Sequence, residues 1–250
     1  MRTRILGIIP ARFASSRFPG KALASLAGRP MIEHVWERAS HSRYLTDLII
    51  ATDDDRIASV ARKFGARVRM TSPSHPTGTD RLAEVASAEE ASLYVNIQGD
   101  EPLINPEAID AAILPLAADP EIAMGTLRKK VDFSDEIQNP NVVKVVTNLA
   151  GDAIYFSRSP IPFERDGRSG LPLYYKHIGL YVYRRDLLLG YPDLPVGPLE
   201  QAEHLEQLRA LENGYRIRVV DTEYESLGVD TPEDLARVNQ IFSLVSPGAS

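Results

Sequence analysis

The chain has 250 residues, of which 44% are hydrophobic and 25% charged, a balance typical of a globular protein that can bury a sizeable core. Its formal net charge of -6 argues against a nucleic-acid partner, whose binding would need a basic excess. It contains no cysteine, which excludes disulfides and thiolate chemistry, and no apolar stretch approaches the roughly 18 residues of a membrane span. We therefore expect a cytoplasmic protein with no membrane partner.

Strand-like runs alternate with helical patterns through the first half of the chain, which is typical of parallel βαβ units. Strands are expected at residues 5–9, 47–51, 66–70 and 93–98. Apolar spacing predicts helices at residues 31–39 and 57–64, the second of which should end at Gly65. Asn105 followed by Pro106 predicts the cap and first turn of a further helix that runs to Leu116.

The second half of the chain is richer in β-type sequence. Strands are expected at residues 142–147, 153–157 and 177–183. Residues 158–172 are rich in proline, glycine and charge, and loops of that length are usually functional or flexible. Two helices should close the chain, one at residues 199–213 that ends at Gly214, and one at residues 231–244 with Thr231 as its cap and Pro232 in its first turn.

A turn-rich loop follows the first strand and has the sequence P-A-R-F-A-S-S-R-F-P-G-K at residues 10–21. Open α/β sheets bind ligands at the carboxyl ends of their strands, and the cations Arg12, Arg17 and Lys21 suit a polyphosphate there. The spacing is neither that of a P-loop nor that of a dinucleotide-binding turn, so charge must contribute more than glycine. The alternative is an arginine-rich surface loop that is merely solvated.

Two aspartates follow expected strands. Asp100 comes after residues 93–98, where Gly99 would let the backbone turn, and Asp230 ends a short expected strand just before the helix capped by Thr231. Mg²⁺ takes hard oxygen ligands, usually few from the protein, and completes its octahedron with phosphates and water. The alternative for each aspartate is a turn residue or a helix cap.

The loop at residues 10–21 is similar to the signature P-A-R-x-x-S-x-R-x-P-G-K of the 3-deoxy-manno-octulosonate (Kdo) cytidylyltransferase family. Further blocks match that family in order: ATDD at 51–54, GTDRLAEV at 78–85, VNIQGDEP at 95–102, YFSR at 155–158, HIGLY at 177–181, LEQLR at 205–209 and GVDTPEDL at 228–235. One block alone could be chance, but so many in order across nearly the whole chain make the resemblance specific.

The resemblance implies a nucleotide-diphospho-sugar transferase-like (Rossmann-like) α/β fold, with a mixed, mainly parallel sheet flanked by helices. It implies a single nucleotidyltransferase domain over residues 1–250, in which about residues 130–195 form a β-rich subregion for substrate and dimer contacts. The implied reaction joins CTP and Kdo into CMP-Kdo and diphosphate for lipopolysaccharide biosynthesis. Mg²⁺ is the implied cofactor and a homodimer the implied assembly. The sequence shows no separate general base.

The resemblance also assigns roles to residues. Lys21, Arg12, Asp100 and Asp230 match the catalytic positions, and the two aspartates match the magnesium ligands. The residues expected on the nucleotide side are Ala11, Arg12, Ser16, Arg17, Lys21, Thr77, Gly78 and Arg81. Asp80 is expected to cap its own helix instead.

An acidic sugar needs a guanidinium and hydrogen-bonding side chains, because arginine offers a planar bidentate fork to a carboxylate. The positions that the resemblance assigns to the sugar are Gln98, Arg158, His177, Glu206 and Gln207. Two structural alternatives stay open at this point. His177 could be a satisfied core histidine, and Arg158 could pair with an acidic neighbour such as Glu164 or Asp166.

Two other functions remain to be separated from this one. The same transfer could act on 8-amino-Kdo or another acidic sugar, although sialate enzymes usually lack the R-x-P-G-K ending that this loop keeps. The second alternative function is that of a catalytically silent regulator that binds a nucleotide sugar. The joint presence of Lys21, Asp100 and Asp230 argues against it. Pyrophosphate release from CTP, Mg²⁺ and a sugar would discriminate among all three.

Overall fold

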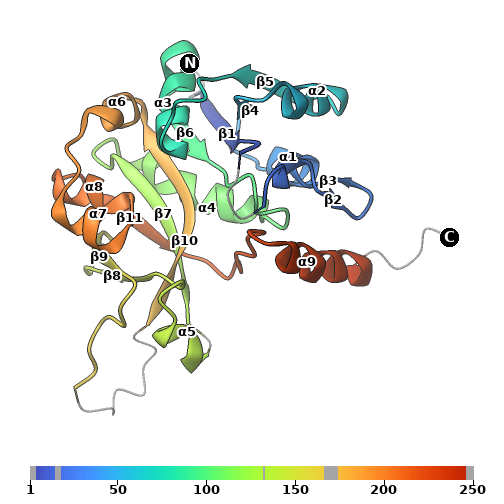
Figure 1. The fold of residues 1–250 in the computed structure, drawn as a ribbon. Coiled ribbons are helices and arrows are strands. Elements are labelled where there is room, and N and C mark those ends of the chain that lie inside the picture. Colours follow the sequence, from blue (N-terminus) through green and yellow to red (C-terminus); the bar gives the residue numbers. More distant parts are fainter. Residues whose placement is uncertain (1–3, 15–17, 132, 166–173, 246–250) are drawn as a thin grey trace.

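The computed structural model of the chain describes residues 4–14, 18–131, 133–165 and 174–245. Over these ranges, nine strands form one mixed sheet (Figure 1). They are β1 (Ile5–Ala11), β4 (Asp47–Thr52), β5 (Arg67–Met70), β6 (Leu93–Asn96), β7 (Met124–Lys130), β8 (Lys144–Thr147), β9 (Ala153–Ser157), β10 (Tyr175–Arg184) and β11 (Ile217–Asp221). The path across the sheet is β11-β7-β10-β6-β1-β4-β5, and β8 joins β10 and β9 beside that path.

The position of β1 in the sheet defines where a ligand can bind. It pairs in parallel with β4 on one side and with β6 on the other, and β4 pairs in parallel with β5. The chain thus builds outward from β1 in one direction and then returns to its other side, which is a topological switch point. Beyond β6, strand β10 runs antiparallel to both β6 and β7. The predicted mixed sheet with parallel βαβ units is confirmed.

Helices cover both faces of the sheet. They are α1 (Met31–Ser40), α2 (Asp55–Lys63), α3 (Gly78–Ala88), α4 (Pro106–Ala118), α5 (Ser134–Gln138), α6 (Arg185–Gly190), α7 (Pro198–Glu203), α8 (Gln207–Glu212) and α9 (Pro232–Val245). Two short 3₁₀ turns, η1 (Lys21–Leu23) and η2 (Tyr191–Asp193), and a small hairpin of β2 (Ser25–Leu26) and β3 (Arg29–Pro30) complete the described elements.

The side chains of β1 alternate between two cores. Ile5 and Ile9 pack with apolar residues of α1, α2 and α4, whereas Leu6 and Ile8 pack with those of α3, α6 and α8. Successive residues of a strand point to opposite faces, and a parallel strand covered on both faces needs apolar residues at every position. This explains why the first strand reads as an unbroken apolar run.

Local sequence signals place several helix ends correctly. Asn105 caps α4 by accepting a hydrogen bond from the backbone N–H of Glu107 at 2.9 Å. Thr231 caps α9 by accepting from the N–H of Asp234 at 3.2 Å. Gly65 follows α2 with a φ of 88°, a left-handed conformation that glycine adopts without strain. These three predicted boundaries are confirmed.

Two expectations about the second half were wrong. The helix expected at residues 199–213 is two helices, α7 and α8, because His204 between them has φ 51° and ψ 49° and so cannot continue the right-handed spiral. Residues 228–230 were expected to end a strand, but they lie in a loop, where the N–H of Val229 donates to the carbonyl of Asp100 at 2.9 Å. That bond ties the loop before α9 to the loop after β6.

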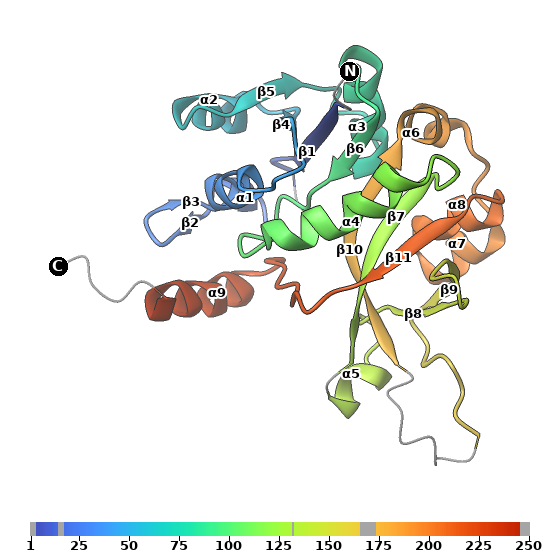
Figure 2. The same cartoon turned by 180° about the vertical axis from the view of Figure 1, so that it is seen from behind.

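Two groups of elements lie outside the main body of the sheet. In both views, the lower end of β10 runs out of the main sheet toward α5, β8 and β9, and α9 lies beside the β2–β3 hairpin (Figure 2). Val238 of α9 packs there against Leu26, Met31 and Val229. Among the elements described above, none of the helices is both long and apolar enough to cross a bilayer.

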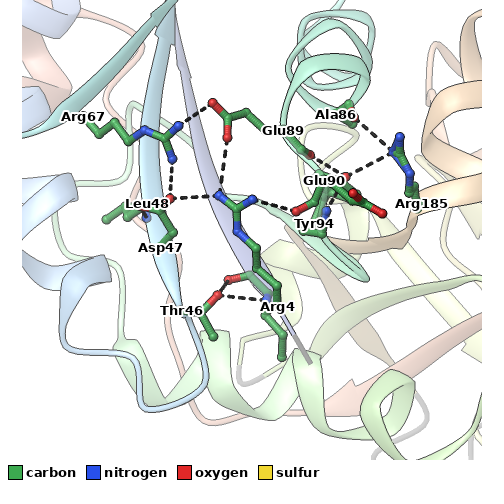
Figure 3. A network of polar contacts seen from close by, with 12 residues as sticks. Arg4, Thr46, Asp47, Leu48, Arg67, Ala86, Glu89, Glu90, Tyr94 and Arg185 are labelled. Carbon is green, nitrogen blue, oxygen red and sulfur yellow. Dashed lines mark hydrogen bonds and ion pairs between the residues drawn. The ribbon is translucent and has the colours of Figure 1, made fainter. Parts of the chain in front are cut away.

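A network of charges joins the amino ends of the strands (Figure 3). Arg4 lies 3.2 Å from Asp47 at the start of β4 and 3.3 Å from Glu89 at the end of α3. Arg67, at the start of β5, pairs with the same two carboxylates. Arg185 joins the same edge through the hydroxyl of Tyr94 and a carbonyl of α3. These charges pair with one another at the amino ends of the strands. They therefore lie away from the carboxyl ends of β1 and β6.

Candidate active site

A pocket of about 410 Å³ opens at the carboxyl ends of β1 and β6. Its walls come from four stretches of chain: the end of β1 with the loop that follows it, the start of α3, the loop after β6 and the loop before α9. The lining residues are Pro10, Ala11, Arg12, Ala14, Lys21, Ala22, Gly78, Arg81, Gln98, Gly99, Asp100 and Asp230. Eight of the residues predicted from the sequence therefore meet in one cavity.

Lys21 joins the two predicted aspartates. Its Nζ lies 2.5 Å from Oδ2 of Asp100 and 3.0 Å from Oδ1 of Asp230. Burial alone would lower the pKa of Lys21, but the attraction and hydrogen bonds of Asp100 and Asp230 outweigh it and raise the pKa above its ordinary value. The ammonium is therefore charged at neutral pH and balances part of the charge of the two carboxylates.

Gly99 allows Asp100 to reach this position. A Cβ at Gly99 would lie 2.7 Å from the carbonyl oxygen of Pro10, which is closer than any side chain tolerates. The sequence suggested that Gly99 was needed for a turn, but its φ lies outside the left-handed region, so the reason for glycine is close packing of two backbones. The loop after β6 thereby lies directly against the end of β1.

The two aspartates fit a divalent cation. Both carboxylates converge on one cationic nitrogen, so a metal could take the place of that charge. Within the ranges that the structure describes, His, Asp and Glu side chains form no group of three or more that could hold a metal by themselves. A Mg²⁺ bound here would therefore need phosphate oxygens and water for its remaining ligands, as Mg²⁺ in nucleotide sites usually does.

Two of the residues predicted to bind the nucleotide line the pocket, the exposed Arg12 and the buried Ala11. The same loop closes on itself where the N–H of Gly20 donates to the carbonyl of Phe13 at 2.9 Å. Ser16 and Arg17, which were also predicted to bind the nucleotide, lie outside the described residues.

The start of α3 is organised by a capping box. Thr77 accepts from the N–H of Asp80, and the Asp80 carboxylate accepts from the N–H of Thr77 at 3.1 Å, which confirms Asp80 as a capping residue. Arg81 lines the pocket but is only 1% exposed. Its guanidinium donates to Asp53 at 2.9 Å and also to the hydroxyl of Thr71, so its visible contacts are structural.

Three of the predicted sugar residues gather around an irregular stretch of β10. Its register against β7 shifts between Ile178 and Tyr181. The Nε2 of Gln98 donates to the carbonyl of Gly179 at 2.9 Å, which connects the pocket to this stretch. His177 lies in β10 just before the shift, and Gln207 at the start of α8 accepts from the hydroxyl of Tyr181 at 3.2 Å.

His177 is a neutral group held from both sides. Its Nε2 lies 2.9 Å from the hydroxyl oxygen of Thr126, which also lies 3.1 Å from the carbonyl of Ile178 and 2.9 Å from that of Leu180. The ring also packs edge-on against Phe156 at 5.0 Å between centroids. Burial lowers the pKa of His177 to about 3. In this structure His177 is therefore a buried histidine with a hydrogen-bond partner, as the structural alternative for this residue expected.

Glu206 lies close to the start of α3, and Gln207 follows it as the first residue of α8. The hydroxyl of Thr77 lies 3.0 Å from Oε1 of Glu206, and burial raises the pKa of the Glu206 carboxyl. Gln207 is 4% exposed, and its buried Nε2 has no hydrogen-bond partner among the described residues. A buried donor without a partner is costly unless a ligand or water satisfies it.

Arg158 is not aimed at the pocket in this structure. Its guanidinium donates to three backbone carbonyls, those of Glu203 at 2.7 Å, Pro140 at 3.0 Å and His204 at 3.3 Å. The alternative partner Asp166 lies outside the described residues. Contact with a sugar carboxylate would require Arg158 to exchange one or more of these bonds.

Sequence reasoning missed two residues that hold predicted ones in place. Asp53 orients Arg81, and it stands in the matched block at residues 51–54, which was a signal without an assigned role. Glu203 accepts hydrogen bonds from the hydroxyl of Ser157 at 2.6 Å and the N–H of Arg158 at 2.9 Å. No local pattern could have indicated the second contact, because Glu203 is more than forty residues away in the chain.

Comparisons with known proteins agree with this geometry. The sequence model of the family described as Cytidylyltransferase matches residues 6–217. Fold and site together define a nucleotidyltransferase of the cytidylyltransferase class.

Close relatives narrow the class further. The 3-deoxy-manno-octulosonate cytidylyltransferase of Solibacter usitatus (strain Ellin6076) is 66% identical over 97% of this chain and 96% of its own length. The protein of the same name from Geobacter sulfurreducens is 59% identical over 94% of this chain and 97% of its own length. This chain belongs to the 3-deoxy-manno-octulosonate cytidylyltransferase family.

Solved structures give the same result. A structure of CMP:2-keto-3-deoxy-manno-octonic acid synthetase complexed with CTP matches with a TM-score of 0.94 and 42% identity, over 98% of this chain and 100% of that one. The 4-diphosphocytidyl-2C-methyl-D-erythritol synthase of Anaerococcus prevotii matches with a TM-score of 0.63 at 16% identity, over 97% of this chain and 100% of that one. The second likeness concerns the fold alone.

Proposed function

We propose that this protein transfers the cytidylyl group of CTP to Kdo, forming CMP-Kdo and diphosphate for lipopolysaccharide biosynthesis. The observation that carries the proposal is the meeting of Lys21, Asp100 and Asp230 in a pocket at the switch point of the sheet, beside the guanidinium of Arg12. Nucleotidyl transfer asks a protein mainly to position the reactants and to neutralise phosphate charge. The pocket supplies cationic groups for both tasks, and its two carboxylates would hold the metal.

In the proposed reaction, the anomeric hydroxyl oxygen of the sugar attacks the α-phosphorus of CTP. The bond from the α-phosphorus to the oxygen bridging to the β-phosphorus breaks, diphosphate leaves with that oxygen, and the proton of the sugar hydroxyl passes to solvent water. Lys21 and Arg12 would neutralise charge that builds up on the phosphates, and Asp100 and Asp230 would hold Mg²⁺ beside them. A bound Mg²⁺ would stabilise phosphate charge and lower the pKa of the sugar hydroxyl.

On the sugar side, Gln98 links the pocket to the β10 stretch that carries His177, and Gln207 offers a donor that needs a partner. We place the sugar toward these groups, with Glu206 beside them. Arg158 would bind the carboxylate after it leaves its backbone carbonyls, and Thr77, Gly78 and Ala11 would lie on the nucleotide side.

Pyrophosphate release tests the proposal. Wild-type protein, CTP and Mg²⁺ should release pyrophosphate with Kdo, and the rate with Kdo should exceed the rates with 8-amino-Kdo and a sialic acid. Asp100→Asn and Asp230→Asn serve as controls that should lose most turnover with little change in thermal stability. If pyrophosphate were released with another acidic sugar and not with Kdo, that other sugar would be the acceptor. CTP binding without any release would favour the silent regulator.

We also propose that the protein is a homodimer that associates through the β-rich subregion near residues 130–195. Large apolar side chains are exposed there, namely Phe133, Leu149, Ile154 and Phe163. Several exposed apolar side chains in one subregion support a binding surface, and a second copy of the chain is the occupant that we propose.

Light scattering on a size-exclusion column tests the dimer. Ile154→Asp combined with Phe163→Asp should shift the mass from two chains to one. Leu244→Asp, which alters an equally exposed apolar side chain on α9, is the matched control and should stay dimeric. A monomeric wild type would contradict the proposal.

A further inference from the structure

Lys21 occupies the place where a metal would be expected in the proposed enzyme. Its ammonium lies within 3.0 Å of one oxygen from each aspartate, and the side chains of Lys21, Asp100 and Asp230 are 19, 29 and 43% exposed. In this arrangement one positive charge already stands between the two carboxylates. A divalent cation bound to the same oxygens would meet that ammonium at close range.

The two cations cannot share the aspartates without strong repulsion, because the pocket is partly shielded from water and Coulomb forces are larger there than in bulk solvent. One of them must leave for the other to bind. The backbone of Lys21 is held by its N–H bond to the carbonyl of Phe18 at 3.2 Å, whereas its side chain is a flexible four-carbon stem. The ammonium can therefore move while the loop stays in place.

A triphosphate offers Lys21 another partner. The pocket that Lys21 lines also contains Arg12, and a nucleotide there would bring several negative charges to it. We propose that Lys21 is an exchangeable stand-in for the metal: it neutralises Asp100 and Asp230 in the free protein, and it moves to the phosphates when CTP binds, so that Mg²⁺ can load only together with the nucleotide. This inference rests on the proposed function.

The proposal has a second consequence for the free protein. The loops that carry Asp100 and Asp230 are joined by the backbone bond from Val229 to Asp100. Without Lys21 the two carboxylates would lose the ammonium that joins them, and like charges repel. A variant that lacks the ammonium should therefore be less stable than wild type and should be stabilised by a divalent cation alone.

The test is a titration of nucleotide-free protein with Mn²⁺, followed by electron paramagnetic resonance of the free ion in the presence of 150 mM KCl (about physiological ionic strength). Lys21→Met should bind Mn²⁺ at least about tenfold more tightly than wild type, equivalent to about 1.4 kcal/mol. Lys21→Arg keeps the charge and is the matched control, which should bind as weakly as wild type. Lys21→Met combined with Asp100→Asn should lose the gained affinity.

Thermal unfolding gives an independent reading. Mn²⁺ without nucleotide should raise the melting temperature of Lys21→Met and leave that of wild type unchanged, and Lys21→Gln replaces Lys21→Met if the methionine variant does not fold. Equal Mn²⁺ affinity of wild type and Lys21→Met, or of Lys21→Met and Lys21→Arg, would overturn the proposal. Neither measurement requires turnover, so a failure to release pyrophosphate would count against the proposed function and not against this exchange.

Discussion

Arg81 shows how a residue can line a pocket and still serve mainly the fold. Its side chain is almost fully buried, and it is paired with Asp53 and Thr71. Removing one partner of a buried ion pair leaves the other charge without compensation, which typically costs about 3 to 5 kcal/mol. The same residue was predicted from the sequence to bind the nucleotide, and its contacts with the protein do not test that role.

Arg81→Met should lower the free energy of unfolding by about 3 to 5 kcal/mol, because Asp53 would lose the cation beside it. Urea unfolding at pH 7 measures this. Arg216→Met is the control: Arg216 is 48% exposed and 3.7 Å from Asp119, so its loss should cost less than about 1 kcal/mol. A stable Arg81→Met protein with weakened CTP binding would instead assign Arg81 to the ligand.

His177 should make stability depend on pH. Burial lowers its pKa from 6.5 to about 3, so between these values the unfolded chain binds a proton that the folded chain does not. Stability from this group is therefore complete above pH 6.5 and falls as the pH drops toward 3, by at most about 1.4 kcal/mol per pH unit.

His177→Gln removes the group that binds this proton in the unfolded chain. The free energy of unfolding of the variant should therefore fall less steeply than that of wild type between pH 6.5 and pH 5. Urea unfolding of both proteins across that range gives the difference, in which the contributions of the other histidines cancel. Parallel curves would mean that His177 titrates normally in the folded protein.

At the scale of elements, the break between α7 and α8 depends on one residue. His204 adopts left-handed backbone angles there, which cost a residue with a Cβ about 1 to 2 kcal/mol more than glycine. The break lets the carbonyls of Glu203 and His204 turn toward the guanidinium of Arg158. A continuous helix would have bonded those carbonyls within itself.

His204→Gly and His204→Ala test the break as a pair. If the left-handed turn is present, the glycine variant should be more stable than the alanine variant by about 1 kcal/mol. In a continuous helix the order would be reversed by a similar amount, because glycine is the poorer helix former. Thermal or urea unfolding of the two variants therefore gives opposite signs for the two structures.

At the scale of the whole molecule, the two ends of the strands carry different groups: a network of ion pairs lies at one end and the pocket at the other. Arg4, Asp47, Arg67 and Glu89 connect the amino ends of the strands, whereas the pocket lies at the carboxyl ends of β1 and β6 (Figure 3). The hydrogen bond from Arg67 lowers the pKa of Glu89, and that from Arg4 adds to the effect, although burial alone would raise the pKa. Changes at the amino ends of the strands should therefore affect stability without altering the chemistry.

Glu89→Gln should lower the free energy of unfolding at pH 7 by about 1 kcal/mol, a figure reduced for the exposure of both arginines, and leave turnover unchanged. Because the folded pKa of Glu89 is depressed, the deficit should be present above the ordinary carboxyl pKa of 4.5 and disappear as the pH falls through the lower folded value. A deficit that is independent of pH would exclude the ionised carboxylate as its cause.

Short-range patterns in the sequence by themselves determined much of this protein. The apolar run of β1, the caps at Asn105 and Thr231 and the alternation of strands and helices depend on residues a few positions apart, so local chemistry identifies them. The composition of the loop after β1 also predicts a polyphosphate site, and that stays a prediction. Strands β7 and β11 went unpredicted, because charged residues interrupt their apolar pattern and pairing with neighbours in the sheet stabilises them.

Only the tertiary structure decided how the candidate site is assembled. Lys21 lies 79 residues from Asp100 and 209 from Asp230 in the chain, and their meeting depends on the close approach of Gly99 to Pro10 and on the bond from Val229 to Asp100. The carbonyl partners of Arg158 and the left-handed turn at His204 are also products of packing. Such contacts depend on which distant segments the sheet brings together, and no local pattern of residues contains that information.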